Sequence, residues 1–167
     1  MRRLLLLLLL ITLVGCGTVT PPRISGVEVE PQWSEAKAEG YPDRIVVKVA
    51  VENPSAAIKI LRGRARVGYG GRRVAMLTLE EKIKIPARTS AVVEVPLRLN
   101  IQRTAQTVQL QAALKQGQTE GIEIDWQVAL RSRGVYVEQA QEATPIEKLA
   151  GAQMEQIKEM LKDIFEE

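Results

Sequence analysis

The stretch RIVVKVAVEN, residues 44–53, alternates apolar and polar side chains along its length. Ile45, Val47, Val49 and Val51 share one parity, and the charged residues of the stretch share the other. Because successive side chains of a strand point to opposite faces, this pattern predicts a β-strand with one buried and one wetted face. The stretches 91–101 and 121–131 repeat the pattern, so the chain is predicted to be mostly β.

A Gly-Gly pair at 70–71 separates two further alternating runs and predicts a hairpin turn. A two-residue loop would mix the apolar and polar faces, whereas a three-residue loop over 70–72 would pair Ala65 with Leu77 on the inside. We therefore expect the three-residue loop. The parity of the apolar residues changes near Leu61, which predicts a bulge or break there.

About seven strands are expected between residues 26 and 141, most of them separated by Pro, Gly, Asn or Ser. A polar stretch rich in helix formers, 102–117, interrupts them and predicts a short inserted helix. Pro96 cannot donate to a strand ladder, so it predicts an edge strand or a bulge. Seven short strands of this kind favour an antiparallel β-sandwich.

The last stretch, residues 144–167, has helical periodicity instead. Thr144, Pro145 and Glu147 match a helix start with a capping box. An apolar stripe follows at spacings of four and three: Ala150, Met154, Ile157, Leu161 and Ile164. The prediction is a C-terminal amphipathic helix. Its contact face, formed by Met154, Ile157, Leu161 and Ile164, either packs on the chain's own sheet or mediates self-association or docking onto a partner protein.

The N-terminus carries a short apolar run, residues 4–14, behind two arginines. In a helix that run would cover about 16 Å, roughly half of the ~30 Å hydrocarbon core, and is therefore typical of a cleaved secretory signal. The only cysteine of the chain, Cys16, follows in the sequence LVGC, which resembles the lipobox of bacterial lipoproteins. The resemblance implies a signal peptide over 1–15, cleavage between Gly15 and Cys16, and a diacylglyceryl thioether on Cys16.

Such lipidation would make the membrane a partner of the mature chain, because two or three acyl chains hold a protein on a bilayer permanently. Residues 16–25 are rich in Pro, Thr and Gly and predict a flexible tether. By the same resemblance, Asp at position 17 would favour the inner membrane. Gly17 lacks that signal, so we expect an outer-membrane protein facing the periplasm.

The composition excludes several function classes. The chain has no histidine, the commonest general base and transition-metal ligand, and the resemblance assigns its only thiol to lipid. We therefore expect no enzyme, metal or cofactor. Loss of two N-terminal arginines leaves 23 − 2 = 21 basic and 20 acidic residues, a balance that gives no reason to expect nucleic-acid binding.

One basic cluster stands out from this balance: Arg62, Arg64, Arg66, Arg72 and Arg73. It has two interpretations. The guanidinium groups suit the phosphates of lipid headgroups or an acidic partner. Alternatively, they form a solvated strand face whose charge is answered by neighbouring acids.

The residues from 47 to 100 resemble the late-embryogenesis-abundant type 2 family, also called the water-stress and hypersensitive-response domain. The features in order are Asn53-Pro54 after a strand, the glycine turn, IPARTS at 85–90 and VVEVPLRL at 92–99. The resemblance implies a fibronectin-like or immunoglobulin-like sandwich, no catalytic residues, and roles in stress tolerance or lipid contact. We interpret Asn53-Pro54 structurally, with Pro fixing the strand exit and Asn capping the turn.

Together these observations predict a lipid-anchored, non-catalytic binding or scaffold module of the cell envelope, with a stress-related role. The alternative is a periplasmic carrier or sensor that holds a lipid or other apolar ligand between the sheets or under the helix.

Overall fold

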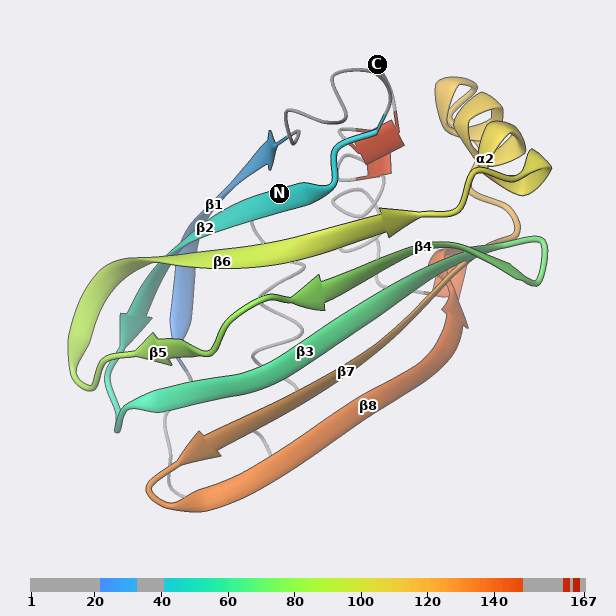
Figure 1. Ribbon diagram of the computed structural model, residues 1–167. Helices are drawn as coiled ribbons and strands as arrows, with labels where there is room; N and C mark the ends of the chain where they lie inside the picture. The colour runs from blue at the N-terminus through green and yellow to red at the C-terminus, as the bar shows by residue number, and fades with distance from the viewer. Residues whose placement is uncertain (1–21, 33–40, 149–160, 163, 166–167) are drawn as a thin grey trace.

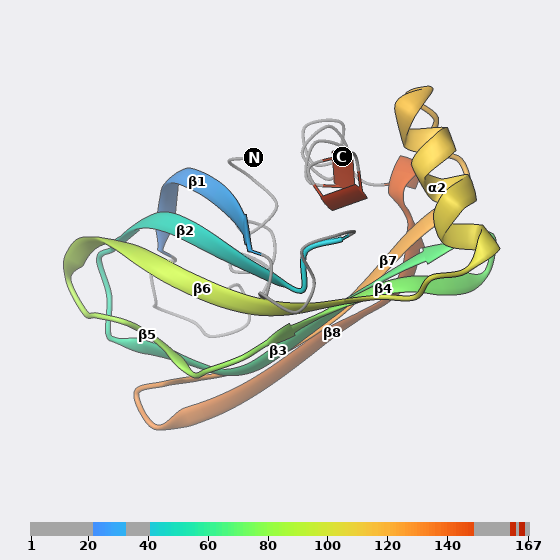
Figure 2. The same cartoon turned by 45° about the horizontal axis from the view of Figure 1, so that its top comes forward.

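The computed structural model describes residues 22–32, 41–148, 161–162 and 164–165. In them the chain forms one antiparallel sheet of eight strands, strongly twisted and curved, with one short α-helix at one end (Figures 1 and 2). The strands are β1 (Arg23–Gln32), β2 (Arg44–Asn53), β3 (Ile58–Tyr69), β4 (Arg72–Leu79), β5 (Ile83–Ile85), β6 (Thr89–Ile101), β7 (Ile122–Ser132) and β8 (Val135–Pro145). The helix is α2 (Ala105–Lys115), as predicted for 102–117, and a 3-10 turn, η2 (Ile146–Lys148), follows β8.

The strands lie in the order β1-β2-β6-β4-β3-β7-β8, and β5 pairs with β3. Strand β6 has 13 residues and is long enough to pair with both β2 and β4, so it joins the β1-β2 part of the sheet to the part that begins with β4. It pairs with β2 from Thr89 to Arg98, and with β4 from Leu97 to Ile101. The predicted two-sheet sandwich is therefore not confirmed. Alternation showed that each strand has one wet face, but it carried no information on which strand pairs with which.

Pro96 was expected on an edge or a bulge, and that prediction is wrong, because β6 is central. The Pro96 carbonyl accepts a hydrogen bond of 3.0 Å from the Glu80 backbone N–H, so the proline nitrogen faces the β4 side. The β4 ladder ends one step away, at Leu79 opposite Leu97. A central strand tolerates the missing N–H at this position because no ladder bond is needed there.

The β3–β4 hairpin pairs Ala65 with Leu77, as predicted, but by another route. The loop has two residues, Gly70 and Gly71, with φ angles of 57° and 74° that glycine adopts readily. A bulge in β4 then leaves Val74 without a partner and shifts the register by one residue. The bulge restores the apolar parity that a two-residue loop alone would break. The break expected near Leu61 is confirmed, as β3 slips against β7 there.

The core lies on the hollow side of the sheet. Alternate side chains of the long strands point into it, including those of β2 from Ile45 to Val51, and Trp126 of β7 is inward as its strand pattern predicted. Leu110 and Leu114 of α2 cover one end. Leu161, Ile164 and Phe165 belong to the same buried cluster, so the C-terminal part of the chain helps to close the core.

The helix predicted over 144–167 is not confirmed. Thr144 pairs with Ile124, and Pro145 pairs with Glu123, so both are in strand β8. The predicted helix start is thus wrong: the ladder with β7 outweighs the local capping signal, and Pro is tolerated because β8 is an edge strand. Residues 161–162 and 164–165 are helical in conformation. Of the predicted contact face, Leu161 and Ile164 are buried, and Met154 and Ile157 lie outside the described residues.

Candidate functional site

The outer face of the sheet carries charged side chains that pair across strands. Five described ion pairs join residues of different strands or of the segment after β4: Lys48–Glu30, Arg44–Glu80 at 2.7 Å, Arg98–Glu80 at 3.4 Å, Arg62–Glu138 at 2.9 Å and Arg66–Asp125 at 2.7 Å. Opposite charges facing each other across a ladder stabilise the pairing of their strands modestly. Much of this face is therefore internally neutralised.

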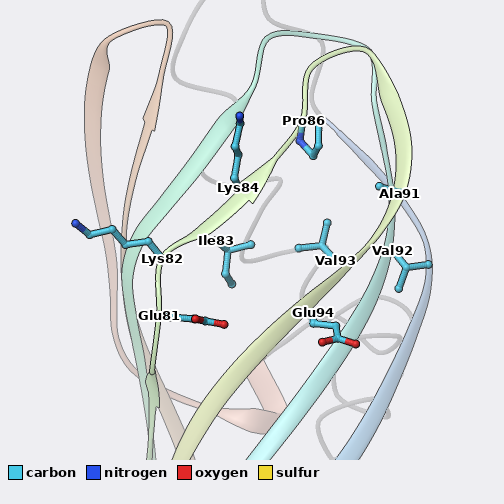
Figure 3. A pocket seen from close by; sticks show the side chains of 9 residues that line it. All are labelled: Glu81, Lys82, Ile83, Lys84, Pro86, Ala91, Val92, Val93 and Glu94. Carbon is cyan, nitrogen blue, oxygen red and sulfur yellow. The ribbon is translucent and has the colours of Figure 1, made fainter.

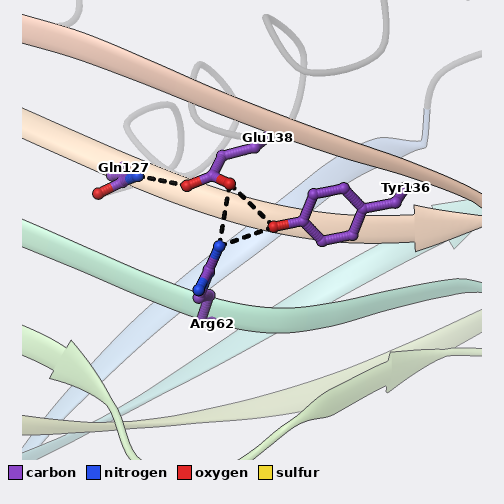
Figure 4. Close-up of polar contacts among 4 residues, drawn as sticks. All are labelled: Arg62, Gln127, Tyr136 and Glu138. Atoms are coloured by element: carbon purple, nitrogen blue, oxygen red, sulfur yellow. Dashed lines mark hydrogen bonds and ion pairs between the residues drawn. The ribbon is translucent and has the colours of Figure 1, made fainter.

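The densest polar group on that face spans three strands (Figure 4). Arg62 of β3 donates to the Tyr136 hydroxyl at 2.8 Å and to the Glu138 carboxylate at 2.9 Å. Tyr136 also donates to Glu138 at 2.9 Å, and the Gln127 amide of β7 donates to the other oxygen of the same carboxylate. Glu138 thus accepts from three side chains, an arrangement that favours its ionised form.

The pKa values follow from these contacts. The hydrogen bonds from Tyr136 and Arg62 lower the pKa of Glu138 below its ordinary value. The same contacts with Glu138 and Tyr136 raise the pKa of Arg62, and the hydrogen bond to Glu30 raises the pKa of Lys48. All three groups lie at the surface, where salt and solvent screen such interactions.

A carboxylate whose pKa is lowered by folding stabilises the protein above its unfolded pKa and loses that contribution as the pH falls through the folded pKa. We expect Glu138→Gln to lower the unfolding temperature slightly at pH 7, with the difference from the wild type vanishing in acid. Thermal unfolding from pH 7 to pH 2 measures this. Glu142→Gln is the matched control, because Glu142 lies on the same strand and makes no ion pair with any described residue. Equal pH profiles for the two variants would contradict the assignment.

The structure does not bring the five predicted arginines into one cluster. Arg62, Arg64 and Arg66 share the outer face of β3, and two of them are paired with acids of β7 and β8. Arg72 and Arg73 begin β4 at one end of the sheet, where the Gln102 side-chain oxygen accepts from Arg73 at 2.9 Å. The interpretation as a solvated face with neighbouring acids therefore fits Arg62 and Arg66. The acids that pair with them lie on strands β8 and β7.

A pocket of about 330 Å³ opens between β5 and β6 (Figure 3). Its lining combines charged and apolar residues: Glu81, Lys82, Ile83, Lys84, Pro86, Ala91, Val92, Val93 and Glu94. Val92 is 66% exposed. This mixed, open lining suits water and ions better than the apolar ligand that a carrier would hold.

Asn53, from the pattern that carried the family resemblance, has a structural role. Its side chain is fully buried. It accepts a hydrogen bond from the Ser55 N–H at 3.1 Å and donates to the carbonyls of Ala56 and Pro86 at 3.0 and 2.6 Å. The predicted turn cap is confirmed, and the same side chain also fastens the β2–β3 turn to the β5–β6 turn.

Other features bear on anchoring and chemistry. Gly15 and Cys16 lie outside the described residues. Among the described residues, no three Cys, Asp or Glu side chains gather as a metal site would need. No helix of the described part of the chain has the length and apolarity to cross a bilayer.

Sequence reasoning missed Tyr136, Glu138 and Gln127. Their common face was visible in part, because Tyr136 and Glu138 share a parity in the predicted last strand. Their proximity to Arg62 requires β7 and β8 to lie beside β3, in that order. A sequence pattern without strand order does not contain that information.

Comparison with known proteins gives a family match and weak structural likenesses. The family model described as late embryogenesis abundant protein matches residues 48–138. A crystal structure of a protein from Archaeoglobus fulgidus is similar at 12% identity, covering 76% of this chain and 99% of that one, with a TM-score of 0.41. No curated protein matches the chain.

Proposed function

Because this chain belongs to the late embryogenesis abundant type 2 family, we propose that it is a lipid-anchored protein of the cell envelope that acts as a non-catalytic binding or scaffold module. The family is non-enzymatic and suggests a stress-related role. The anchor in this proposal is a thioether on Cys16, formed after cleavage behind Gly15.

The observation that carries the proposal is the position of the only cysteine. Cys16 stands directly behind the apolar run and a small residue, and the remaining 151 residues contain no second thiol. A cysteine unrelated to lipidation would have to fall by chance directly behind both the apolar run and the small residue. Two or three acyl chains on one sulfur and one amine would attach the mature chain to a bilayer without a spanning helix. By the sorting inference from Gly17, that bilayer is the outer membrane, and the domain faces the periplasm.

The described fold supports a module that works by its surface. Its sheet presents a long outer face of paired charges on one side and closes its core on the other. Exposed, regularly spaced side chains on a rigid sheet provide a surface for contacts with a partner or a bilayer. The pocket between β5 and β6 does not support the carrier alternative, because it is open and lined partly by charged side chains.

Cys16→Ser tests the anchor. We expect the variant to accumulate as an unprocessed precursor and to incorporate no labelled fatty acid in its own host, because the sulfur that accepts the lipid is gone. Metabolic labelling and mass spectrometry of the purified product measure both effects.

The matched control is Thr18→Ser, which introduces the same residue two positions later and keeps the cysteine. It should be processed and acylated like the wild type. Normal maturation of Cys16→Ser would overturn the proposal.

A further inference from the structure

One end of the sheet collects cations that lack acidic partners. The paired ends of the strands place the β2–β3, β5–β6 and β7–β8 turns together at this end (Figures 1 and 2). We call it the basic end, and it consists of Lys59, Lys84, Arg88, Arg131 and Arg133. All five side chains are exposed, and none of them takes part in an ion pair within the described part of the chain.

Three of these cations form a row across neighbouring strands. Lys59 of β3 is directly opposite Lys84 of β5 on one side and directly opposite Arg131 of β7 on the other. Like charges facing each other across a ladder destabilise a sheet. Arg44 and Arg98 also face each other across β2 and β6, but both are paired with Glu80. The row departs from that arrangement, because none of its three cations has an acid partner among the described residues. Such a departure is expected at a functional surface.

Two turns add a further arginine each. Arg88 in the β5–β6 turn has a φ of 48°, and Arg133 in the β7–β8 turn has a φ of 50°. These are the described non-glycine residues with positive φ, a conformation that side chains other than Asn, Asp and Gly rarely adopt. Two turns at the same end of the sheet thus each carry an arginine in a backbone conformation that glycine adopts more readily.

The chain that leads to the proposed anchor arrives at this same end. Arg23, the first residue of β1, pairs with Glu52 next to the β2–β3 turn. Six residues separate it from Cys16, and the seven steps from Cys16 to Arg23 span at most about 25 Å when the chain is fully extended. A lipid on Cys16 would therefore hold the basic end, rather than the far end with α2, near the bilayer.

We propose that the basic end docks on a bilayer surface with anionic headgroups, and that it sets the orientation of the domain on the membrane. This inference rests on the proposed anchor, which supplies attachment, whereas the cations supply orientation. Lys and Arg near an anionic surface are attracted over about a Debye length, close to 10 Å at 0.1 M salt. A partner of opposite charge also explains why like charges are kept opposite each other.

The test uses the full acylated protein, reconstituted into vesicles of phosphatidylcholine with or without phosphatidylglycerol. Because Cys16 is the only native cysteine and its sulfur would carry lipid, an added thiol can be labelled selectively. Ala87→Cys places a fluorophore in the β5–β6 turn, and Gln118→Cys places it beyond α2 at the far end. With quenchers on the lipid headgroups, we expect strong quenching at position 87 and little at position 118, provided that the vesicles contain phosphatidylglycerol.

Two charge variants with the same net change complete the design. Lys59→Gln, Lys84→Gln and Arg131→Gln together remove the row, while Arg72→Gln, Arg103→Gln and Lys115→Gln remove three exposed cations at the far end. The first set should abolish the difference in quenching between positions 87 and 118, and the second should leave it. Removing facing like charges should also leave the unfolding temperature equal or higher, which separates lost docking from lost folding.

Equal quenching at positions 87 and 118, or loss of the difference in both variant sets, would overturn the docking. The acyl mass is measured on the same preparation. If the proposed anchor is wrong, the protein lacks the acyl mass. If only the proposed orientation is wrong, the protein carries the acyl mass but shows no difference in quenching between the two positions.

Discussion

Phe165→Ala is expected to lower the free energy of unfolding by about 3–5 kcal/mol, the usual cost of removing a buried aromatic ring. Phe165 is only 1% exposed, although only two residues follow it in the sequence. Its ring and that of Tyr41 pack in a T-shaped arrangement with a centroid distance of 5.7 Å. Its carbonyl accepts a hydrogen bond of 2.7 Å from the Gln111 amide of α2. The residue thus ties the C-terminus to the core from two sides.

Chemical denaturation of the wild type and the variant measures this loss. Phe165→Leu should cost less, because it keeps most of the apolar volume. Val108→Ala on α2 is the surface control: Val108 is 63% exposed, so its truncation should have little effect. If Phe165→Ala unfolded at the same denaturant concentration as Val108→Ala, the C-terminal part of the chain would not belong to the core.

Alternation predicted the strands well where one face is buried and the other is wet. Strands β2, β6 and β7 were found because apolar residues recur at every second position over ten or more residues. Local turn chemistry also carried information, since Gly70-Gly71 and the cap at Asn53 were both identified. These features depend on neighbours in the sequence, so the sequence contains the physical cause.

Features that depend on contacts between distant segments were not predictable. The loop of the β3–β4 hairpin was expected to be three residues long, because a bulge at Val74 has no local signal. Thr144-Pro145 has the pattern of a helix start, but the ladder with β7 decides its conformation. The single sheet depends on β6 reaching both β2 and β4, which requires knowledge of strand order.

The same limit applied to the candidate surface. Parity placed Arg62, Arg64 and Arg66 on one face correctly, but it could not supply Asp125 and Glu138 as partners. The row of Lys59, Lys84 and Arg131 spans 73 positions of sequence, 131 − 59 + 1, and becomes a row only when β5, β3 and β7 pair. Charges that look unremarkable along the chain can thus form one patch in the fold.

Asn53→Ala is expected to lower the free energy of unfolding by about 2–5 kcal/mol, because each buried polar group left without a partner costs about 1–3 kcal/mol. The variant would leave the Ser55 N–H without its acceptor and the carbonyls of Ala56 and Pro86 without a donor. The larger part of the effect should come from the bond to Pro86, which joins segments 33 residues apart.

Two further variants separate the roles of this side chain. Asn53→Asp keeps an acceptor for Ser55 but removes both donors and places a carboxyl group at a fully buried position. Burial raises the pKa of such a carboxyl group, so stability gained in acid should be lost as the pH rises through that raised pKa. Asn53→Asp should therefore be more damaging at pH 7 than at pH 4, while Asn53→Ala should show no such dependence.

Ser132→Ala is the control at the same end of the sheet. The Ser132 hydroxyl, at the end of β7, donates a long hydrogen bond of 3.3 Å to the Ala57 carbonyl in the β2–β3 turn. Its loss should cost about 1 kcal/mol or less. Denaturation of the four proteins at both pH values measures these differences. A loss for Asn53→Ala no greater than that for Ser132→Ala would show that the two turns are held together by other contacts. The larger loss is expected because one buried amide satisfies three backbone groups at once.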